Sequence, residues 1–227
     1  MQLGRDRIQI SSWKSSTVVA NLVPFPAGQA LSIEIVEKAL NDARSSGFEA
    51  AYTAAMTPPQ VAPFVACGFK IQEELHLLHQ PLEDLATPPR EHTRRGHRLD
   101  WDDVLALDEL AFSDPFWKFD RASLTDAMRA TPRHRFQVTR TTPVAGYHVT
   151  GLATNNAYIQ RVAVHPDAQG GGHGRKLVEH ALYWGWRHGA RMAYVNTQLE
   201  NERARNLYQR CGFELAEHRL QVLHRTL

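Results

Sequence analysis

A glycine-rich segment that joins an apolar run to a helical pattern constrains this sequence most. Residues 162–178 read VAVHPDAQGGGHGRKLV, with four glycines at 170, 171, 172 and 174. Glycine lets consecutive backbone N–H groups turn toward one anion, and the positive end of a following helix adds to the attraction. The segment therefore predicts a phosphate-binding loop between a strand and a helix.

Two common phosphate-binding motifs do not fit this loop. The dinucleotide fingerprint needs GxGxxG at the start of a longer unit, and the P-loop needs GK[ST], which is absent here. A plain strand-to-helix turn stays open until the downstream residues are read. There, residues 201–213 form the pattern N-x-x-A-x-x-L-Y-x-x-x-G-F, which predicts a helix and its exit into a last strand.

The two patterns together resemble the GNAT acetyltransferases. The acetyl-CoA motif of that family, V-x-P-x-x-[Q/R]-x-x-G-x-[G/A], is matched at Val164, Pro166, Gln169, Gly172 and Gly174. The resemblance covers residues 92–224, with a faint echo over 7–80. It implies an α/β (α+β) GNAT fold, with a mixed, mostly antiparallel sheet flanked by helices, and acetyl-CoA as cosubstrate.

The resemblance also implies site residues. The backbone of residues 162–164 is expected to pair with the pantetheine arm, and the loop to hold the pyrophosphate. The expected cofactor-binding residues are Val162, Ala163, Val164, Gln169, Gly170, Gly171, Gly172, His173, Gly174, Arg175, Asn201 and Tyr208. Asn201 is equally well read as a helix N-cap.

Tyr208 is the expected general acid that protonates the departing thiolate, because a phenol donates at neutral pH. It also lies on an apolar stripe, so a core aromatic is the alternative. The general base is not identified: Asn196 and Tyr158 stand where relatives carry a carboxylate. Proton removal through water to Glu200, Asp114 or solvent stays open, as does an acceptor amine of low pKa.

An internal repeat is visible in the first eighty residues. Residues 35–52 align without a gap on 177–194 with seven identities, and Cys67-Gly68-Phe69 aligns on Cys211-Gly212-Phe213. Pro24 matches Pro166, but the loop glycines are lost: Ala30 and Ser32 stand in their places, and Phe64 replaces Tyr208. The first copy is therefore expected to be a truncated, degenerate GNAT half-domain with a structural role.

Proline and charge interrupt all periodicity after residue 80, which indicates a boundary. The expected division is a degenerate domain 1–80, a linker 81–91 and an acetyl-CoA-binding domain 92–227. In the last, we expect a strand at 92–99, helices at 101–112 and 122–130, and an antiparallel meander at 135–140, 144–152 and 158–164.

Composition excludes several classes of function. The longest apolar runs are far too short for a membrane span, and no signal pattern opens the chain, so a cytoplasmic location is the default. The net charge of +2 argues against a nucleic-acid partner, and the arginines at 90–98 are read as a solvated linker. Two cysteines predict buried reduced thiols, and the scattered histidines predict no metal site.

The predicted function is transfer of acetyl from acetyl-CoA to a primary amine by direct attack. Leu107-Asp108, Phe112 and Asp114-Pro115 resemble the ribosomal-protein N-terminal acetyltransferases. Phe116, Trp117 and Phe119 suggest a peptide N-terminus or a partly apolar amine, unless they pack the helical cap. The alternative is a non-catalytic acetyl-CoA-binding regulator or scaffold. We expect a monomer, with the two copies as a pseudo-dimer, or a homodimer.

Overall fold

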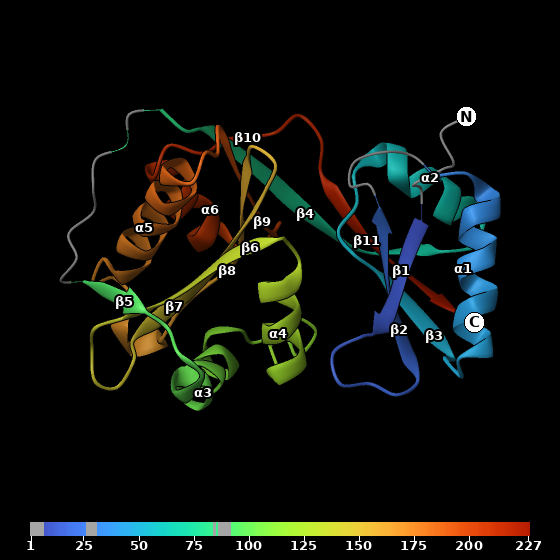
Figure 1. Cartoon of the computed structure of the whole chain (residues 1–227), viewed down its shortest axis with the longest axis horizontal. Helices are drawn as coiled ribbons and strands as arrows, with labels where there is room; N and C mark the ends of the chain where they lie inside the picture. The colour runs from blue at the N-terminus through green and yellow to red at the C-terminus, as the bar shows by residue number, and fades with distance from the viewer. Residues whose placement is uncertain (1–6, 26–30, 84, 86–91) are drawn as a thin grey trace. The chain divides into compact units, whose positions relative to one another are not determined.

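The computed structural model describes residues 7–25, 31–83, 85 and 92–227. The chain divides into unit 1, which is Met1–Leu77, Thr197–Glu200 and Ala216–Leu227, and unit 2, which is Leu78–Asn196 and Asn201–Leu215 (Figure 1). The expectations for Ala30, and for residues 84 and 86–91 of the linker, lie outside the described residues.

Unit 1 combines two helices with a small sheet. Its elements are β1 (Arg7–Ser12), β2 (Val19–Phe25), α1 (Ile33–Ser45), β3 (Ala50–Thr53), α2 (Pro58–Ala66), the part of β4 (Lys70–Pro81) up to Leu77, and β11 (Leu220–Thr226). Its strand order is β1-β2-β3-β11-β4, with β2 and β3 parallel and the other pairs antiparallel.

The core of unit 1 forms between its helices and its sheet. Val36, Leu40 and Ala43 recur at helical spacing on α1, so they share one face, and all three are buried. They pack in one cluster with Phe64 of α2 and Leu223 of β11. The rings of Phe64 and Phe69 meet edge to face at 5.2 Å.

The last strand of the chain belongs to unit 1. Leu223 of β11 is fully buried there, and its N–H donates to Oγ1 of Thr53 at 2.9 Å. His224 pairs with Tyr52 on one side and with Lys70 on the other. The expected domain 92–227 therefore differs from the observed unit 2, because β11 fills the position between β3 and β4.

Unit 2 contains a longer sheet with helices on both faces. Its elements are the end of β4, β5 (Thr93–Arg95), α3 (Trp101–Ala111), α4 (Arg121–Arg129), β6 (Arg133–Thr139), β7 (Gly146–Ala153), β8 (Asn156–Val164), α5 (His173–Arg187), β9 (Met192–Gln198) up to Asn196, α6 (Glu202–Arg210) and β10 (Glu214–Leu215). The strand order is β4-β9-β8-β7-β6-β5, and β10 pairs with β4.

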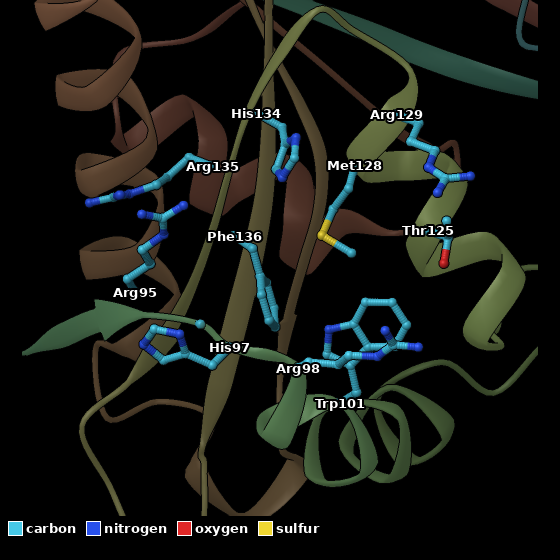
Figure 2. A pocket seen from close by; sticks show the side chains of 11 residues that line it. Arg95, His97, Arg98, Trp101, Thr125, Met128, Arg129, His134, Arg135 and Phe136 are labelled. Carbon is cyan, nitrogen blue, oxygen red and sulfur yellow. The ribbon is translucent and has the colours of Figure 1, made fainter.

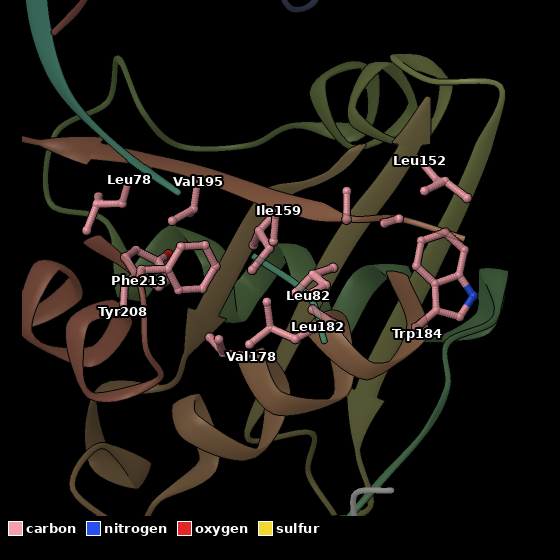
Figure 3. Close-up of a cluster of buried hydrophobic side chains, with 14 residues drawn as sticks. Leu78, Leu82, Leu152, Ile159, Val178, Leu182, Trp184, Val195, Tyr208 and Phe213 are labelled. Carbon is pink, nitrogen blue, oxygen red and sulfur yellow. The ribbon is translucent and has the colours of Figure 1, made fainter. Parts of the chain in front are cut away.

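Two buried hydrophobic clusters pack on the two faces of this sheet. On one face, Val178 and Leu182 of α5 pack on Ile159 and Val195, with Tyr208 and Phe213 together at one end of the cluster (Figure 3). On the other face, α3 and α4 pack on β6 and β7 (Figure 1) through a second cluster that contains Leu107, Leu124 and Val149, among others. The sheet is thus buried on both sides.

The expected antiparallel meander is confirmed, since β6, β7 and β8 pair in antiparallel order. Asp120 caps α4, and its carboxylate accepts the N–H of Ser123 at 2.7 Å. The strand expected at 92–99 is wrong in length. β5 ends at Arg95, because after one more backbone bond, from Gly96 N–H to the Phe136 carbonyl at 3.0 Å, the chain turns into a 3-10 helix at Arg98–Asp100.

The thiols differ from expectation in one respect. Cys67 is buried, whereas Cys211 is only half-buried, and both are free. Within the part of the chain that the structure describes, no helix is both long enough and apolar enough for a membrane span.

Candidate functional site

The glycine-rich loop starts where β8 ends. The side-chain amide of Gln169 donates to the carbonyl of Val164 at 3.0 Å, which ties the loop to the strand end. Between them, Pro166–Ala168 form a 3-10 turn, and Nδ1 of His165 accepts the N–H of Asp167 at 3.2 Å. The loop is therefore held by its own residues.

Two glycines of the loop have backbone conformations that other residues rarely adopt. Gly170 has φ +84° and Gly172, the N-cap of α5, has φ +79°. A Cβ on either would meet no atom within 4 Å, so the space in front of both is open. The first bond within α5 runs from Lys176 N–H to the Gly172 carbonyl, which leaves the N–H groups before it without a helical acceptor.

An unpaired strand edge lies beside this helix start. The parallel pairing of β8 with β9 covers Asn156–Ile159 and Met192–Val195 and then ends. Residues 161–164 continue to pair with β7 on their other side. Toward β9, the backbone of Val162–Val164 is therefore free to pair with another extended chain.

The edge and the helix start line one cavity of about 720 Å³. The predicted cofactor-binding residues on its lining are Val162, Ala163, Val164, Gln169, Gly170, Gly172, His173, Gly174, Arg175, Asn201 and Tyr208. Gly171 is not among them, and its N–H donates to the Ala168 carbonyl at 3.4 Å. The structure thus brings together all but one of the predicted residues.

Helix α6 adds lining residues that the sequence reading missed. Arg203, Asn206 and Arg210 line the cavity beside Leu207. Their spacing of three and four residues puts them on one face of α6, a signal that helical periodicity could have given. With Arg175 from α5, three arginines reach the lining, where Glu202 is the one acidic residue among those described.

Tyr208 is both a residue of the hydrophobic core and a lining residue of the cavity. Its ring is buried, packs against Phe213 at a centroid distance of 5.8 Å and belongs to the core cluster (Figure 3). It also lines the cavity. Burial raises the pKa of its phenol well above the usual range, so the hydroxyl stays protonated and can donate at neutral pH.

Asn201 is both a helix cap and a lining residue of the cavity. Its side-chain oxygen accepts the N–H of Ala204 at 3.0 Å, which caps α6, and the residue lines the cavity. One turn later, Leu207 packs on Gly174, where a Cβ would come within 3.1 Å of its side chain. A Cβ at position 174 would therefore crowd the Leu207 side chain where α5 packs on α6.

A buried ion pair beneath the loop after α3 was not found from the sequence. Arg161 of β8 binds both carboxylate oxygens of Asp108 at 2.8 and 2.5 Å, and the side chains are 7% and 0% exposed. Asp108 also accepts the Tyr147 hydroxyl at 2.6 Å. The guanidinium lies between the rings of Phe112 and Phe119, at 3.4 and 4.1 Å from their centroids.

This pair fixes the aromatic loop that was expected to face the acceptor. Arg161 donates to the Trp117 carbonyl at 2.8 Å, and Asp108 accepts the Phe119 N–H at 2.8 Å. Asp114 accepts the Phe116 N–H at 2.8 Å, so its carboxylate is engaged in the turn. Because Phe112 lines the cavity, the loop is anchored at the cavity wall.

The two expected positions of a general base hold no carboxylate. Tyr158 stacks on Tyr194 at 5.7 Å, and its hydroxyl accepts from Asn156 at 3.3 Å. Asn196 is exposed on β9. The site as built can bind a phosphate-bearing extended molecule and donate a proton from Tyr208.

Comparisons with known proteins point in the same direction. The family model described as Acetyltransferase (GNAT) family matches residues 100–213, about half of the chain. No curated protein matches the chain.

Several solved structures resemble the chain. The tandem GNAT protein from the clavulanic acid biosynthesis pathway has a TM-score of 0.65 and 16% identity, covering 96% of this chain and 78% of that one. A GCN5-related N-acetyltransferase from Kribbella flavida has 0.63 and 15%, covering 96% and 89%. The ribosomal-protein-S18-alanine N-acetyltransferase from Escherichia coli has 0.50 and 18%, covering 59% and 92%. Likeness at these identities shows the fold alone.

Proposed function

The chain belongs to the GNAT acetyltransferase family, and from this premise we propose that unit 2 moves the acetyl group of acetyl-CoA to a primary amine by direct attack in a ternary complex. Acetyl transfer from acetyl-CoA to an amine is what membership implies. The observation that carries the proposal is one cavity lined by both the open edge Val162–Val164 and the N-terminus of α5.

The residues present fit acetyl-CoA. Its amide-bearing arm matches an unpaired strand edge, and its diphosphate matches the loop Gly170–Arg175 with the first turn of α5. Arg175, Arg203 and Arg210 add positive charge on the same lining. When bound, acetyl-CoA supplies the activated thioester.

We assign the general acid to Tyr208. Its buried phenol stays protonated and lines the cavity, so it can donate a proton to a developing thiolate. The N–H groups along Val162–Val164 are the candidate donors to the developing oxyanion. Asn201 caps α6 and thereby sets the position of Tyr208 two turns along.

The amine is proposed to lose its proton to water. The expected base positions hold Tyr158 and Asn196, and Asp114 is hydrogen-bonded to the backbone of its own loop. A water-mediated path, or an acceptor whose amine has a low pKa, supplies a neutral nucleophile without a dedicated carboxylate.

The acceptor is proposed to be a peptide N-terminus or a partly apolar amine. Phe112 lines the cavity, and the loop that carries Phe116, Trp117 and Phe119 is tied to Arg161 and Asp108. Phe112 on the lining, with the aromatic loop anchored next to it, favours an apolar group beside the amine over a polycation. The fold likeness to an enzyme whose name gives a protein alanine as acceptor supports this class.

Unit 1 is proposed to derive from a second, degenerate copy, which makes the protein a tandem form. The alignment of residues 35–52 on 177–194 supports this, as does the likeness to a tandem GNAT protein. In unit 1 the positions that align with Val162–Val164 are Ala20–Leu22, and all three pair with β3, so the edge is not open at that place. Its proposed role is therefore structural, and it includes β11 from the end of the chain.

A non-catalytic acetyl-CoA-binding regulator is the second candidate, favoured by the lack of a carboxylate at Tyr158 and Asn196. Free-thiol release from acetyl-CoA with a panel of peptides, amino acids, aminoglycosides and polyamines separates the two. We expect release with at least one peptide or apolar amine, and loss of release in Tyr208→Phe. Tight binding without release across the panel would favour the regulator.

A further inference from the structure

One ring on the lining of the acetyl-CoA cavity is held by a buried charge. Phe112 follows the end of α3 and lines the cavity, and Arg161 of β8 contacts its ring without being among the described lining residues. The guanidinium lies 3.4 Å from the centroid of the Phe112 ring and 4.1 Å from that of Phe119. Because this cation is buried, its attraction to the two rings adds to their contact with it.

The guanidinium is itself fixed, so the ring that it contacts is fixed too. It binds both carboxylate oxygens of Asp108 and donates to the Trp117 carbonyl at 2.8 Å. Asp108 is fully buried and also accepts the N–H of Phe119 at 2.8 Å. These bonds join β8, α3 and the loop after α3. They need the planar fork of an arginine, which the single ammonium group of a lysine does not offer.

The held ring lies near the groups that are proposed to react. Phe112 packs against the hydrophobic cluster that contains Ala163, a residue of the open strand edge. The positive charge of Arg161 lowers the pKa of the Tyr208 phenol, against the larger effect of burial, so the guanidinium is close to the proposed acid. Phe112 therefore belongs to the wall beside the thioester.

A ring at this place can select the group that stands next to the attacking amine. The Phe112 side chain is half-buried, so part of it is open to the cavity. One methylene group in an apolar pocket changes kcat/KM about 10- to 200-fold, and a wall displaced by about 1 Å can cost as much. The position of Phe112 is therefore sufficient to set selectivity.

We propose that Arg161 is a positioning residue, which holds Phe112 at the acceptor end of the cavity and thereby makes unit 2 prefer an amine with an apolar group on the adjacent carbon. The inference rests on the proposed function and adds the residue that sets its selectivity. Arg161 acts through Phe112, so its replacement changes the KM for the acceptor and leaves acetyl-CoA binding intact.

The start of α3 provides a matched control. There, Arg94 of β5 binds both carboxylate oxygens of Asp100 at 2.8 and 2.6 Å, and Arg98 lies 5.6 Å from the ring centroid of Trp101 (Figure 2). Arg98 and Trp101 line a smaller cavity of about 330 Å³, whose described lining residues do not include any of the acetyl-CoA cavity. Arg94→Lys therefore changes the same kind of pair at the opposite end of the helix from Phe112.

Thiol release with leucinamide and glycinamide as acceptors tests the proposal. Both carry an α-amine of low pKa, and only leucinamide has an apolar group beside it. We expect the wild type to favour leucinamide about tenfold in kcat/KM. Arg161→Lys keeps the charge that Asp108 needs; it should raise the KM for leucinamide about tenfold and change the KM for glycinamide, both kcat values and the Kd of acetyl-CoA less than about twofold. Arg94→Lys should leave all of these within about twofold.

A double-mutant cycle tests whether Arg161 acts through Phe112. Phe112→Ala should raise the KM for leucinamide as much as Arg161→Lys does, and the double variant should raise it by no more than about a further twofold. Because the Phe112 ring is half-buried, Phe112→Ala also tests the wall if Arg161→Lys fails to fold.

Four results would overturn the inference and leave acetyl transfer intact: no preference of the wild type for leucinamide, an unchanged KM in Arg161→Lys or Phe112→Ala, an equal rise in Arg94→Lys, or additive effects in the double variant. Thiol release with other amines but with neither amide would also overturn it. Release with no amine at all would count against the proposed function, and this inference would fall with it.

Discussion

Helix α1 of unit 1 and helix α5 of unit 2 end in the same way and begin differently. After α1, Gly47 takes φ +86° and the N–H of Phe48 returns to Ala43; after α5, Gly189 takes φ +96° and the N–H of Ala190 returns to Gly185. These exits are the usual glycine-closed helix ends. At the start, α1 has Ser32 in an extended conformation, whereas α5 has Gly172 with a positive φ.

The strands before these helices show the second difference. In unit 1, β2 stays paired with β3 through Leu22, whose carbonyl also accepts the N–H of Ala54 at 3.0 Å. In unit 2, β8 leaves β9 after Ile159, so five residues of strand edge stay open before His165. Both units thus share the helix packing and the glycine-closed helix exit, while the glycine start of α5 and the open edge at Val162–Val164 have no counterpart at the aligned positions that the structure describes in unit 1.

The largest expected effect comes from replacing a residue of unit 2 by the one that unit 1 carries at the aligned position. Tyr208→Phe copies Phe64 and should lower kcat about 10²- to 10⁴-fold, because the leaving thiolate loses its proton donor. Steady-state kinetics measure kcat, and the Kd of acetyl-CoA should stay within about twofold. Unchanged turnover would leave Tyr208 as a core aromatic only.

The second largest effect concerns charge burial. Asp108→Asn leaves Arg161 buried without its partner and should lower the free energy of unfolding by about 3–5 kcal/mol. The control is Glu74→Gln in unit 1, whose partner Arg219 has a side chain 52% exposed, with an expected change of about 0–1 kcal/mol. Denaturant titration measures both, and equal losses would remove the distinction between the two pairs.

The glycine start of α5 can be tested with a matched residue of the same conformation. Gly172→Ala should raise the Kd of acetyl-CoA about tenfold, because a positive φ costs about 1–2 kcal/mol with a Cβ. Gly189→Ala bears a similar strain, with φ +96° and open space, but lies at the far end of α5. If both variants bind acetyl-CoA with the same Kd, the glycine loop does not hold the diphosphate.

The smallest expected effect follows from buried histidines in unit 2. His148 Nε2 lies 3.1 Å from His180 Nδ1; burial lowers the pKa of both, that of His180 to about 4, with Arg135 adding to it. The folded chain therefore resists protonation that the unfolded chain accepts below about pH 6.5, so stability falls as pH drops toward 4, by about 1.4 kcal/mol per pH unit for His180.

Unfolding at pH 7 and pH 5 should show this loss in the wild type and a smaller one in His180→Gln. An identical pH dependence in the variant would mean that His180 does not titrate as its burial requires. Comparing the two proteins removes the contribution of the carboxylates that both share.

Local patterns explain what the sequence could predict. The strand Val162–Val164, the glycine loop and the helix from Asn201 are each encoded by neighbouring residues, and all line one cavity. The ion pair of Arg161 with Asp108 joins residues far apart in sequence, and the sequence around neither residue indicates its partner. The place of β11 in unit 1 depends on the strands β3 and β4 with which it pairs. The local sequence of residues 220–226 does not indicate these partners.

The number of acetyl-CoA molecules bound per chain tests whether unit 2 alone binds the cofactor. We expect one site by calorimetric titration of the wild type, weakened about tenfold in Gly172→Ala and unchanged in Gly189→Ala. Two sites per chain, or a single site that Gly172→Ala does not weaken, would contradict it.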